Sequence, residues 1–333
     1  MGTVIDSITK NRQPVDVLRA MTARAFGPGR VPEGEDWFRE LGNGWYNAAY
    51  VVRLRDGERA VLKIAPPTHV EVMTYERRAM ATEVAALRLI REHTTVPVPE
   101  VHFHDDSREL CDAEWFFMSH IDAEDLGEAR AALSPAAYAA HREQLGAANR
   151  LLNEIKGERF GPLLHGPHGT RWREVFCAMV EDVLRDGERR RVDIGWDYDA
   201  VRALFAERGE CLEEVTQPVF VSWDLWDPNV MVRDGALVGL IDHERPLYGD
   251  PLMEAGFAGA VEAEVAPETR AFLRGYGRGP LTATERERRR LYTVHLLLIM
   301  VIETVFRGHT DPSQYESSKA RLATLLGEFG LRR

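Results

Sequence analysis

The chain has 333 residues, of which 44% are hydrophobic and 29% are charged, and its formal net charge is -11 at pH 7. This composition is ordinary for a globular protein and too apolar for a disordered one, and the length fits one large domain or two lobes. The acidic balance argues against nucleic acid as the main partner, because phosphate binding needs clustered Lys and Arg. It is compatible with a cationic partner.

The cysteines and the apolar runs indicate the cellular compartment in which the protein is expected. Cys111, Cys177 and Cys211 are far apart and form no CxxC or CxxH pair, so neither a structural zinc site nor a disulfide framework is expected. The longest strongly apolar run, residues 294–302, is too short to span a bilayer, and the N-terminal stretch lacks an apolar signal segment. We therefore expect a cytoplasmic protein without a membrane partner.

The first third of the chain is rich in predicted strands. Two β-rich runs flank Arg55-Asp56-Gly57, and an Asp-Gly turn in that position predicts a β-hairpin. Apolar residues at helical spacing predict amphipathic helices before and after the hairpin. The expected elements are a helix at 14–26, strands at 47–54 and 59–65, a helix at 75–93, and extended segments at 96–104 and 111–121.

Helical patterns dominate the rest of the chain, over residues 134–155 and 172–208. The apolar run 294–302 is expected to be a buried helix. A strand-rich first third followed by a helix-rich remainder predicts the α+β class with two lobes and a crossover near residues 118–122.

The stretch VSWDLWDPNVMV, residues 221–232, places Asp224 and Asn229 among apolar side chains. A turn at Arg233-Asp234-Gly235 and a second apolar run ending in Asp242 predict another hairpin, whose open ends lie side by side. Asn229 and Asp242 should therefore be neighbours, with Asp224 close to both, and such oxygen ligands suit Mg²⁺. A lone aspartate is usually a turn or a cap, but the combination matches the catalytic and metal loops of kinase-type phosphotransferases.

Lys63 lies inside the apolar run AVLKIA, in a chain that has only four lysines. A compact ammonium can contact nucleotide phosphates, whereas the alternative is an edge-strand lysine that reaches out to water. Kinase-type enzymes hold this lysine with a helix glutamate. Glu83 is the expected partner because it begins a regular helical pattern, and Glu76 is the alternative.

The segments LKIA, ATEVAALRLI and VPVPEV, together with WDLWDPNV and GLIDHERPLYGDPL, resemble the aminoglycoside phosphotransferase family of small-molecule kinases. The resemblance extends from about residue 40 to about residue 310. It implies a bilobal protein-kinase-like fold of the α+β class, with a small antiparallel-sheet N-lobe at 1–118, a hinge at 119–122 and a larger, mainly helical C-lobe at 123–333.

The resemblance also implies roles for single residues. Asp224 matches the catalytic base, and Asn229 and Asp242 match the two ligands of Mg²⁺. The residues that it assigns to the binding of ATP or GTP are Lys63 and Glu83 at the phosphates, Gly42, Gly44 and Asn47 in the flap, and Met118, Ser119 and Ile121 in the hinge.

Two positions depart from the family's pattern. Ser222 stands two residues before the catalytic aspartate, where the family usually has a histidine that supports the loop. His243 follows the metal aspartate, where an aromatic residue is more common. A structural histidine is expected there, because Asp224 already supplies the base.

We therefore expect an ATP- or GTP-dependent phosphotransferase that acts on a hydroxyl of a small molecule, such as an aminoglycoside or another antibiotic, with a role in resistance. Choline-like alcohols and amino-acid alcohols fit as acceptors as well, because fold resemblance does not choose among them. Glu244, Glu254 and Glu303 are candidates to line a pocket for a cationic acceptor. The alternative, equally compatible with the sequence, is a solvated face for Glu254 and a buried structural partner for Glu303. Residues 161–198, with Trp172 and Trp196, are the candidate acceptor-recognition region.

Two other classes of function stay open. A pseudokinase-like module that binds nucleotide without transferring phosphate is favoured by Ser222 and opposed by the other motif residues. A hydrolase using Asp224 and Asp242 would leave Lys63 without a role.

Overall fold

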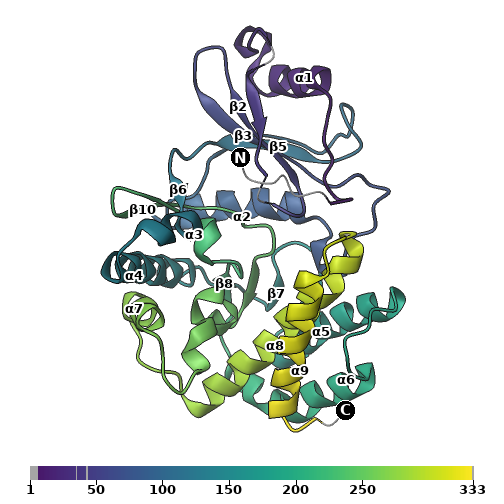
Figure 1. The fold of residues 1–333 in the computed structure, drawn as a ribbon, viewed down its shortest axis with the longest axis vertical. Coiled ribbons are helices and arrows are strands. Elements are labelled where there is room, and N and C mark those ends of the chain that lie inside the picture. Colours follow the sequence, from purple (N-terminus) through teal and green to yellow (C-terminus); the bar gives the residue numbers. More distant parts are fainter. Residues whose placement is uncertain (1–6, 35, 43, 332–333) are drawn as a thin grey trace.

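The computed structural model describes residues 7–34, 36–42 and 44–331. A sheet-rich lobe formed by the first third of the chain lies at one end of the molecule, and a larger lobe made mainly of helices lies at the other (Figure 1). The predicted α+β class with two lobes is confirmed.

The smaller lobe is built on a five-stranded antiparallel sheet in the order β1-β2-β3-β5-β4. Its strands are β1 (Phe38–Glu40), β2 (Ala48–Arg53), β3 (Arg59–Ile64), β4 (Val101–Asp105) and β5 (Trp115–Ser119). β2 and β3 pair from Ala48↔Ile64 to Arg53↔Arg59. The hairpin turn between them includes Gly57 at φ 88°, a left-handed conformation that glycine adopts without strain.

Two helices accompany this sheet, α1 (Val15–Phe26) and α2 (Ala79–His93). The predicted helix at 75–93 begins four residues late. Residues Thr74–Glu76 form a single 3-10 turn, and Arg78 has φ 61°. A left-handed residue cannot continue a right-handed helix, so α2 starts only after it.

The larger lobe contains the remaining helices. They are α3 (Leu126–Ala129), α4 (Pro135–Leu152), α5 (Trp172–Arg189), α6 (Tyr198–Arg208), α7 (Pro267–Tyr276), α8 (Ala283–Phe306) and α9 (Ser313–Glu328). The single helical pattern predicted over 172–208 is divided in two, because Arg191 and Gly195 have φ 51° and 80° after the end of α5, and Asp197 then caps α6 by accepting a hydrogen bond from Ala200 N.

Two short sheets in this lobe carry the segments with the motif residues. One has the order β10-β9-β6 and the other β7-β11-β8. Their strands are β6 (Glu124–Asp125), β7 (Gly161–Pro162), β8 (Val219–Val221), β9 (Val230–Arg233), β10 (Ala236–Leu240) and β11 (Leu247–Gly249). The antiparallel pairing of β9 with β10 confirms the second predicted hairpin.

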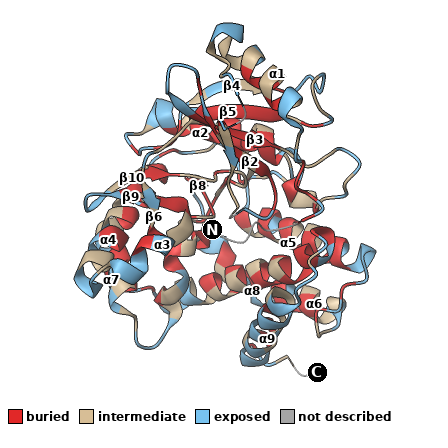
Figure 2. Cartoon of the chain, turned by 45° about the horizontal axis from the view of Figure 1, so that its top comes forward, coloured by how far each residue is buried: buried red, intermediate tan, exposed pale blue. Residues whose placement is uncertain are grey.

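Buried residues run through both lobes (Figure 2). The smaller lobe packs α1 against the sheet through Leu18, Met21 and Trp115, and the larger core includes most of α8, with Val294 and Ile302 fully buried. Burying one such side chain stabilises the fold by about 1.5–3 kcal/mol. Among the described residues, no helix is long and apolar enough to cross a membrane.

Candidate active site

Lys63, Glu83 and Asp242 meet between the two lobes. The Lys63 ammonium on β3 lies 2.7 Å from Glu83 Oε1 on α2 and 2.8 Å from Asp242 Oδ1, which follows β10. Burial would lower the pKa of Lys63, but the charges of Asp242 and Glu83 outweigh it and raise that pKa. Burial would likewise raise the pKa of Asp242, and the neighbouring ammonium holds it below its ordinary value. Lys63 is therefore charged and fixed in place.

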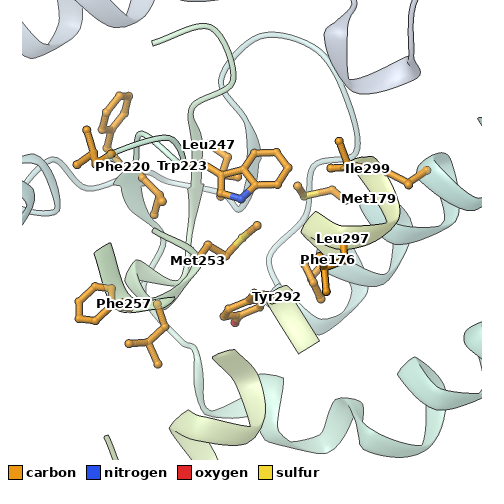
Figure 3. Close-up of a cluster of buried hydrophobic side chains, with 14 of the residues drawn as sticks. Phe176, Met179, Phe220, Trp223, Leu247, Met253, Phe257, Tyr292, Leu297 and Ile299 are labelled. Atoms are coloured by element: carbon orange, nitrogen blue, oxygen red, sulfur yellow. The ribbon is translucent and has the colours of Figure 1, made fainter. Parts of the chain in front are cut away.

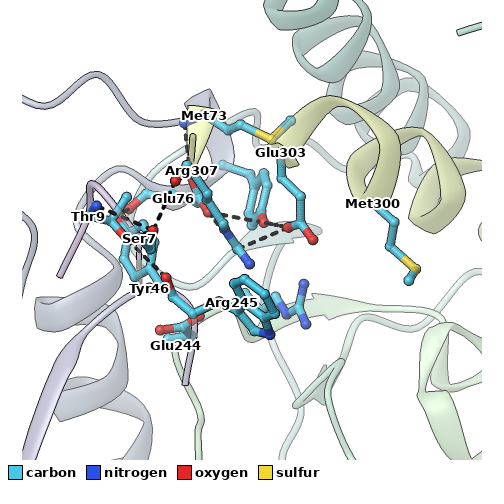
Figure 4. A network of polar contacts seen from close by, with 12 residues as sticks. Ser7, Thr9, Tyr46, Met73, Glu76, Glu244, Arg245, Met300, Glu303 and Arg307 are labelled. Atoms are coloured by element: carbon cyan, nitrogen blue, oxygen red, sulfur yellow. Dashed lines mark hydrogen bonds and ion pairs between the residues drawn. The ribbon is translucent and has the colours of Figure 1, made fainter. Parts of the chain in front are cut away.

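Glu76, the alternative partner for Lys63, belongs to a different network. Its carboxylate lies 2.9 Å from Arg307, which also pairs with Glu303 at 2.9 Å (Figure 4). Tyr75 donates a hydrogen bond to Glu303, at 3.4 Å. Of the two alternatives for Glu303, a pocket-lining residue and a buried structural partner, the structure shows the second.

Asp224 and Asn229 lie in the loop that joins β8 to β9. Asn229 Nδ2 donates hydrogen bonds of 3.0 Å to both the carbonyl and Oδ2 of Asp224, and this leaves the amide oxygen of Asn229 available to another group. Ile241 N donates to the Asn229 carbonyl at 3.0 Å. The predicted meeting of the two hairpin ends is therefore confirmed.

The backbone on both sides of the site is strained. Trp223 and Asp242 each have φ 66°, a conformation that costs a non-glycine residue about 1–3 kcal/mol. Glu254, fully buried, offsets this cost at Trp223. Its carboxylate accepts hydrogen bonds from Trp223 N at 2.9 Å and Leu225 N at 2.7 Å. Glu254 therefore supports the loop. It neither lines a pocket nor lies on a solvated face, so both alternatives held for it were wrong.

Arg245 is a site residue that the sequence did not reveal. Its Nη2 lies 2.7 Å from Asp224 Oδ1, and its guanidinium lies over the Trp223 ring at 5.4 Å. Burial raises the pKa of Asp224, and the charge of Arg245 opposes this rise. The sequence shows only that an arginine lies three residues after Asp242. Where this side chain points depends on the left-handed backbone at Asp242, which the sequence does not reveal.

Ser222 and His243 form a direct contact beneath the two loops. Ser222 Oγ lies 2.7 Å from His243 Nδ1, and His243 Nε2 lies 3.3 Å from the Leu240 carbonyl. A carbonyl only accepts, so Nε2 carries the proton and the Ser222 hydroxyl donates to Nδ1. Burial lowers the pKa of His243 to about 4, so the ring is neutral at pH 7. The expected structural role of His243 agrees with this geometry.

The predicted flap and hinge residues lie in the smaller lobe and just after its last strand. Asn47 is buried and donates to Glu244 Oε2 at 3.0 Å, which ties the flap to the segment after Asp242. Met118 and Ser119 end β5, and Ile121 follows them and lies against Gly239 of β10. Gly44 has nothing within 4 Å of the position that a Cβ would take, so the flap is open there; Gly42 lies at the exit of β1.

Carboxylates gather next to Lys63. One oxygen each from Glu83, Asp242 and Glu244 lie within 4.8 Å of one another. Burial, together with the charge of Asp242, raises the pKa of Glu244 to about 8. Hard oxygen donors at this separation fit a divalent cation such as Mg²⁺.

A cleft opens beside the Asp224 loop. The region 161–198, the candidate acceptor-recognition region, contributes to it through the loop after β7 and through α5. Trp172 does not, because it is buried and donates to Tyr292 Oη at 2.8 Å. The residues that line the cleft are Thr74, Tyr75, Arg77, Thr82, Pro162, His165, Gly166, Pro167, Met179, Asp182, Trp223, Glu244, Arg245, Pro246, Leu247 and His295.

The sequence of this chain matches the model of one known protein family. The model of the phosphotransferase enzyme family, APH, matches residues 37–292. No curated protein matches the sequence.

Solved structures share the fold at low identity. A thermostable mutant of aminoglycoside phosphotransferase APH(4)-Ia, in complex with ADP and hygromycin B, is 16% identical, with 95% of this chain and 99% of that chain covered and a TM-score of 0.63. Macrolide 2'-phosphotransferase MphH from Brachybacterium faecium is 17% identical, with 92% and 98% covered and a TM-score of 0.59. The gentamicin complex of APH(2")-IIa is 14% identical, with 94% and 96% covered and a TM-score of 0.62.

Proposed function

Because the chain belongs to the phosphotransferase enzyme family and is a small-molecule kinase, we propose that it transfers a phosphoryl group from ATP or GTP to a hydroxyl of a small molecule. The observation that carries this proposal is the convergence of Lys63 and Glu83 with Asp242, next to the Asp224–Asn229 pair. These residues come from β3, α2 and the two loops that flank the β9–β10 hairpin.

Asp224 is the proposed catalytic base. One of its oxygens accepts from Arg245 and the other from Asn229, and each carboxylate oxygen has a second lone pair. The acceptor hydroxyl can donate to that free position without displacing either neighbour. Asp224 then orients the hydroxyl and takes its proton as the phosphoryl group is transferred.

Asn229 and Asp242 are the proposed ligands of Mg²⁺. The amide oxygen of Asn229 is not used by its contacts with Asp224, and Asp242 binds Lys63 through Oδ1 alone. When bound, Mg²⁺ supplies positive charge against the phosphates of the donor. Lys63, oriented by Glu83, adds a second positive charge at the same phosphates.

The other nucleotide contacts follow from the position of the flap and the hinge. Gly42, Gly44 and Asn47 would cover the phosphates, and Met118, Ser119 and Ile121 would hold the base of the nucleotide. This assignment places the smaller lobe at 1–118, the hinge at 119–122 and the larger lobe at 123–333. The aminoglycoside and macrolide enzymes that share the fold support an antibiotic as acceptor and a role in resistance.

A pseudokinase-like module is the second candidate, favoured by Ser222 and by the ion pair that engages Asp224 in the absence of substrate. A thermal-shift titration with Mg²⁺ and ATP or GTP, followed by a screen for acceptor-stimulated release of ADP or GDP, separates the two functions. Stabilisation with turnover supports the kinase, and stabilisation without turnover across hydroxylated amines and antibiotics supports the module. Absence of metal-dependent nucleotide stabilisation would refute both.

A further inference from the structure

The cleft beside Asp224 is placed to receive the acceptor. Trp223 and Arg245 line it, and Arg245 contacts the Asp224 carboxylate directly at 2.7 Å. The walls of the cleft can therefore report the chemistry of the acceptor.

Much of the wall is apolar. Figure 3 shows the indole of Trp223 in the buried cluster of the larger lobe, with Met179 and Leu247 near it. The ring of His295 stacks on this indole with a centroid separation of 5.3 Å and an interplanar angle of 4°. Burial lowers the pKa of His295 to about 3, so this ring adds no charge at pH 7. Pro162, Pro167 and Pro246 extend the apolar surface.

The charged groups of the cleft are mostly committed to partners. Arg245 is paired with Asp224. Glu244 accepts a hydrogen bond from Asn47 and lies beside Asp242 and Lys63 on the nucleotide side. Two groups remain, Arg77 at the exposed rim and Asp182 on α5.

Asp182 has no hydrogen bond or ion pair within the described part of the chain, although it is partly buried. Burial and the neighbouring charge of Asp186 raise its pKa, against Arg185 and Arg77. A partly buried carboxylate without a partner is costly unless a ligand cation compensates it. Since Arg77 contributes positive charge at the rim, the cleft offers one carboxylate to a cation and opposes the approach of several.

We propose that the acceptor is a hydroxylated molecule with an extended apolar face and a single ammonium group, and that Asp182 binds this ammonium while the hydroxyl reaches Asp224. This inference rests on the proposed phosphotransferase function. It departs from the simplest reading of the acidic net charge, in which the acceptor would be a polycation. The apolar wall of Trp223, Met179 and Leu247 would hold the face of the molecule.

The test compares acceptor binding by the full-length protein loaded with Mg²⁺ and a non-hydrolysable ATP analogue. The probes are lincomycin and erythromycin, each with one ammonium group, chloramphenicol, which is neutral, and gentamicin and hygromycin B, which carry several. Calorimetric titration should show tighter binding of at least one mono-ammonium compound than of either polycation. The same order is expected for kcat/KM in nucleotide-coupled turnover.

Asp182→Asn tests the assigned residue. It should weaken the mono-ammonium compound about tenfold or more, as expected for loss of a charge-assisted hydrogen bond, and leave the affinity for nucleotide and for chloramphenicol unchanged. Asp106→Asn, the same change on an exposed loop of the smaller lobe, is the matched control and should alter neither.

Two results would overturn the inference: tighter binding of a polycation than of every mono-ammonium probe, or unchanged affinity for the mono-ammonium probe in Asp182→Asn. Failure of all the probes to bind the nucleotide-loaded protein also counts against it. Failure of the phosphotransferase proposal is distinguishable, because it is seen either in the absence of Mg²⁺-dependent nucleotide stabilisation before any acceptor is added or in acceptor binding that is not followed by nucleotide turnover.

Discussion

The contact between Ser222 and His243 links the catalytic loop to the segment after Asp242, and its removal gives a quantitative test of the site. Both side chains are almost fully buried, with exposed fractions of 1% and 0%. Ser222 lies two residues before Asp224, and His243 directly follows Asp242. Their 2.7 Å hydrogen bond therefore fixes the spacing of the two loops that carry the proposed base and metal ligands.

The size of the effect follows from this burial. Ser222→Ala leaves the ring nitrogen Nδ1 of His243 as a buried acceptor without a donor, which costs about 1–3 kcal/mol. His243→Phe keeps the ring but removes the acceptor for Ser222 and the donor to the Leu240 carbonyl, so it should cost at least as much. The double variant should be more stable than the sum of the two losses predicts, by about 0.5–1.5 kcal/mol.

Urea unfolding of the two single variants and the double variant measures this coupling. Steady-state kinetics of the same proteins should show a fall in kcat with the KM for ATP unchanged, because the pair positions Asp224 and does not contact the nucleotide. Ser317→Ala, at an exposed position on α9, is the control and should change neither quantity. Strictly additive stability losses, or a change in KM for ATP without a change in kcat, would refute the reasoning.

Other predictions follow from single contacts. Asp224→Asn should lower kcat by about 10²–10⁴-fold, the usual contribution of a general base, while nucleotide affinity by calorimetry is retained; unchanged turnover would contradict the assignment. Glu254→Gln should destabilise the protein by about 1–3 kcal/mol in urea unfolding, because an amide has one acceptor oxygen and leaves Trp223 N or Leu225 N unpaired; wild-type stability would exclude the supporting role. Because burial lowers the pKa of both His243 and His295 below the unfolded value of about 6.5, stability should be complete above that pH and fall as the pH drops toward 4, by about 2 kcal/mol per histidine between pH 7 and pH 5. His295→Phe should remove its share of this acid sensitivity, and an unchanged pH profile of unfolding would count against buried neutral histidines.

Short-range sequence patterns predicted most of the fold and about half of the site. The Asp-Gly turns between β-rich runs predicted both hairpins, and the second hairpin alone brings Asn229 next to Asp242. The contact of Lys63 with Asp242 joins residues from different lobes. This contact was not predicted, because hydrophobic periodicity carries no information about how two lobes face each other, and the resemblance implied only that both residues act at the nucleotide phosphates.

What the sequence did not predict depends on backbone conformations that residue type does not report. The start of α2 was misplaced because Arg78 adopts a left-handed conformation that arginine seldom takes. Glu254 gave no sign that its carboxylate would accept backbone hydrogen bonds from a loop thirty residues earlier. Asp182 looked like any solvated acidic residue on α5, because the cleft that surrounds it is formed by segments far apart in the chain.

Arg245 bears on the choice between an active kinase and a module that only binds nucleotide. A buried guanidinium and a buried carboxylate each need a partner, and the Arg245–Asp224 pair meets both needs before any ligand arrives. Because the pair uses one lone pair of one carboxylate oxygen, Asp224 keeps positions for an acceptor hydroxyl, and the charge of Arg245 opposes the rise that burial causes in the pKa of Asp224. The contact that at first suggests a blocked base is therefore compatible with a prepared one, and this geometry favours transfer over simple binding.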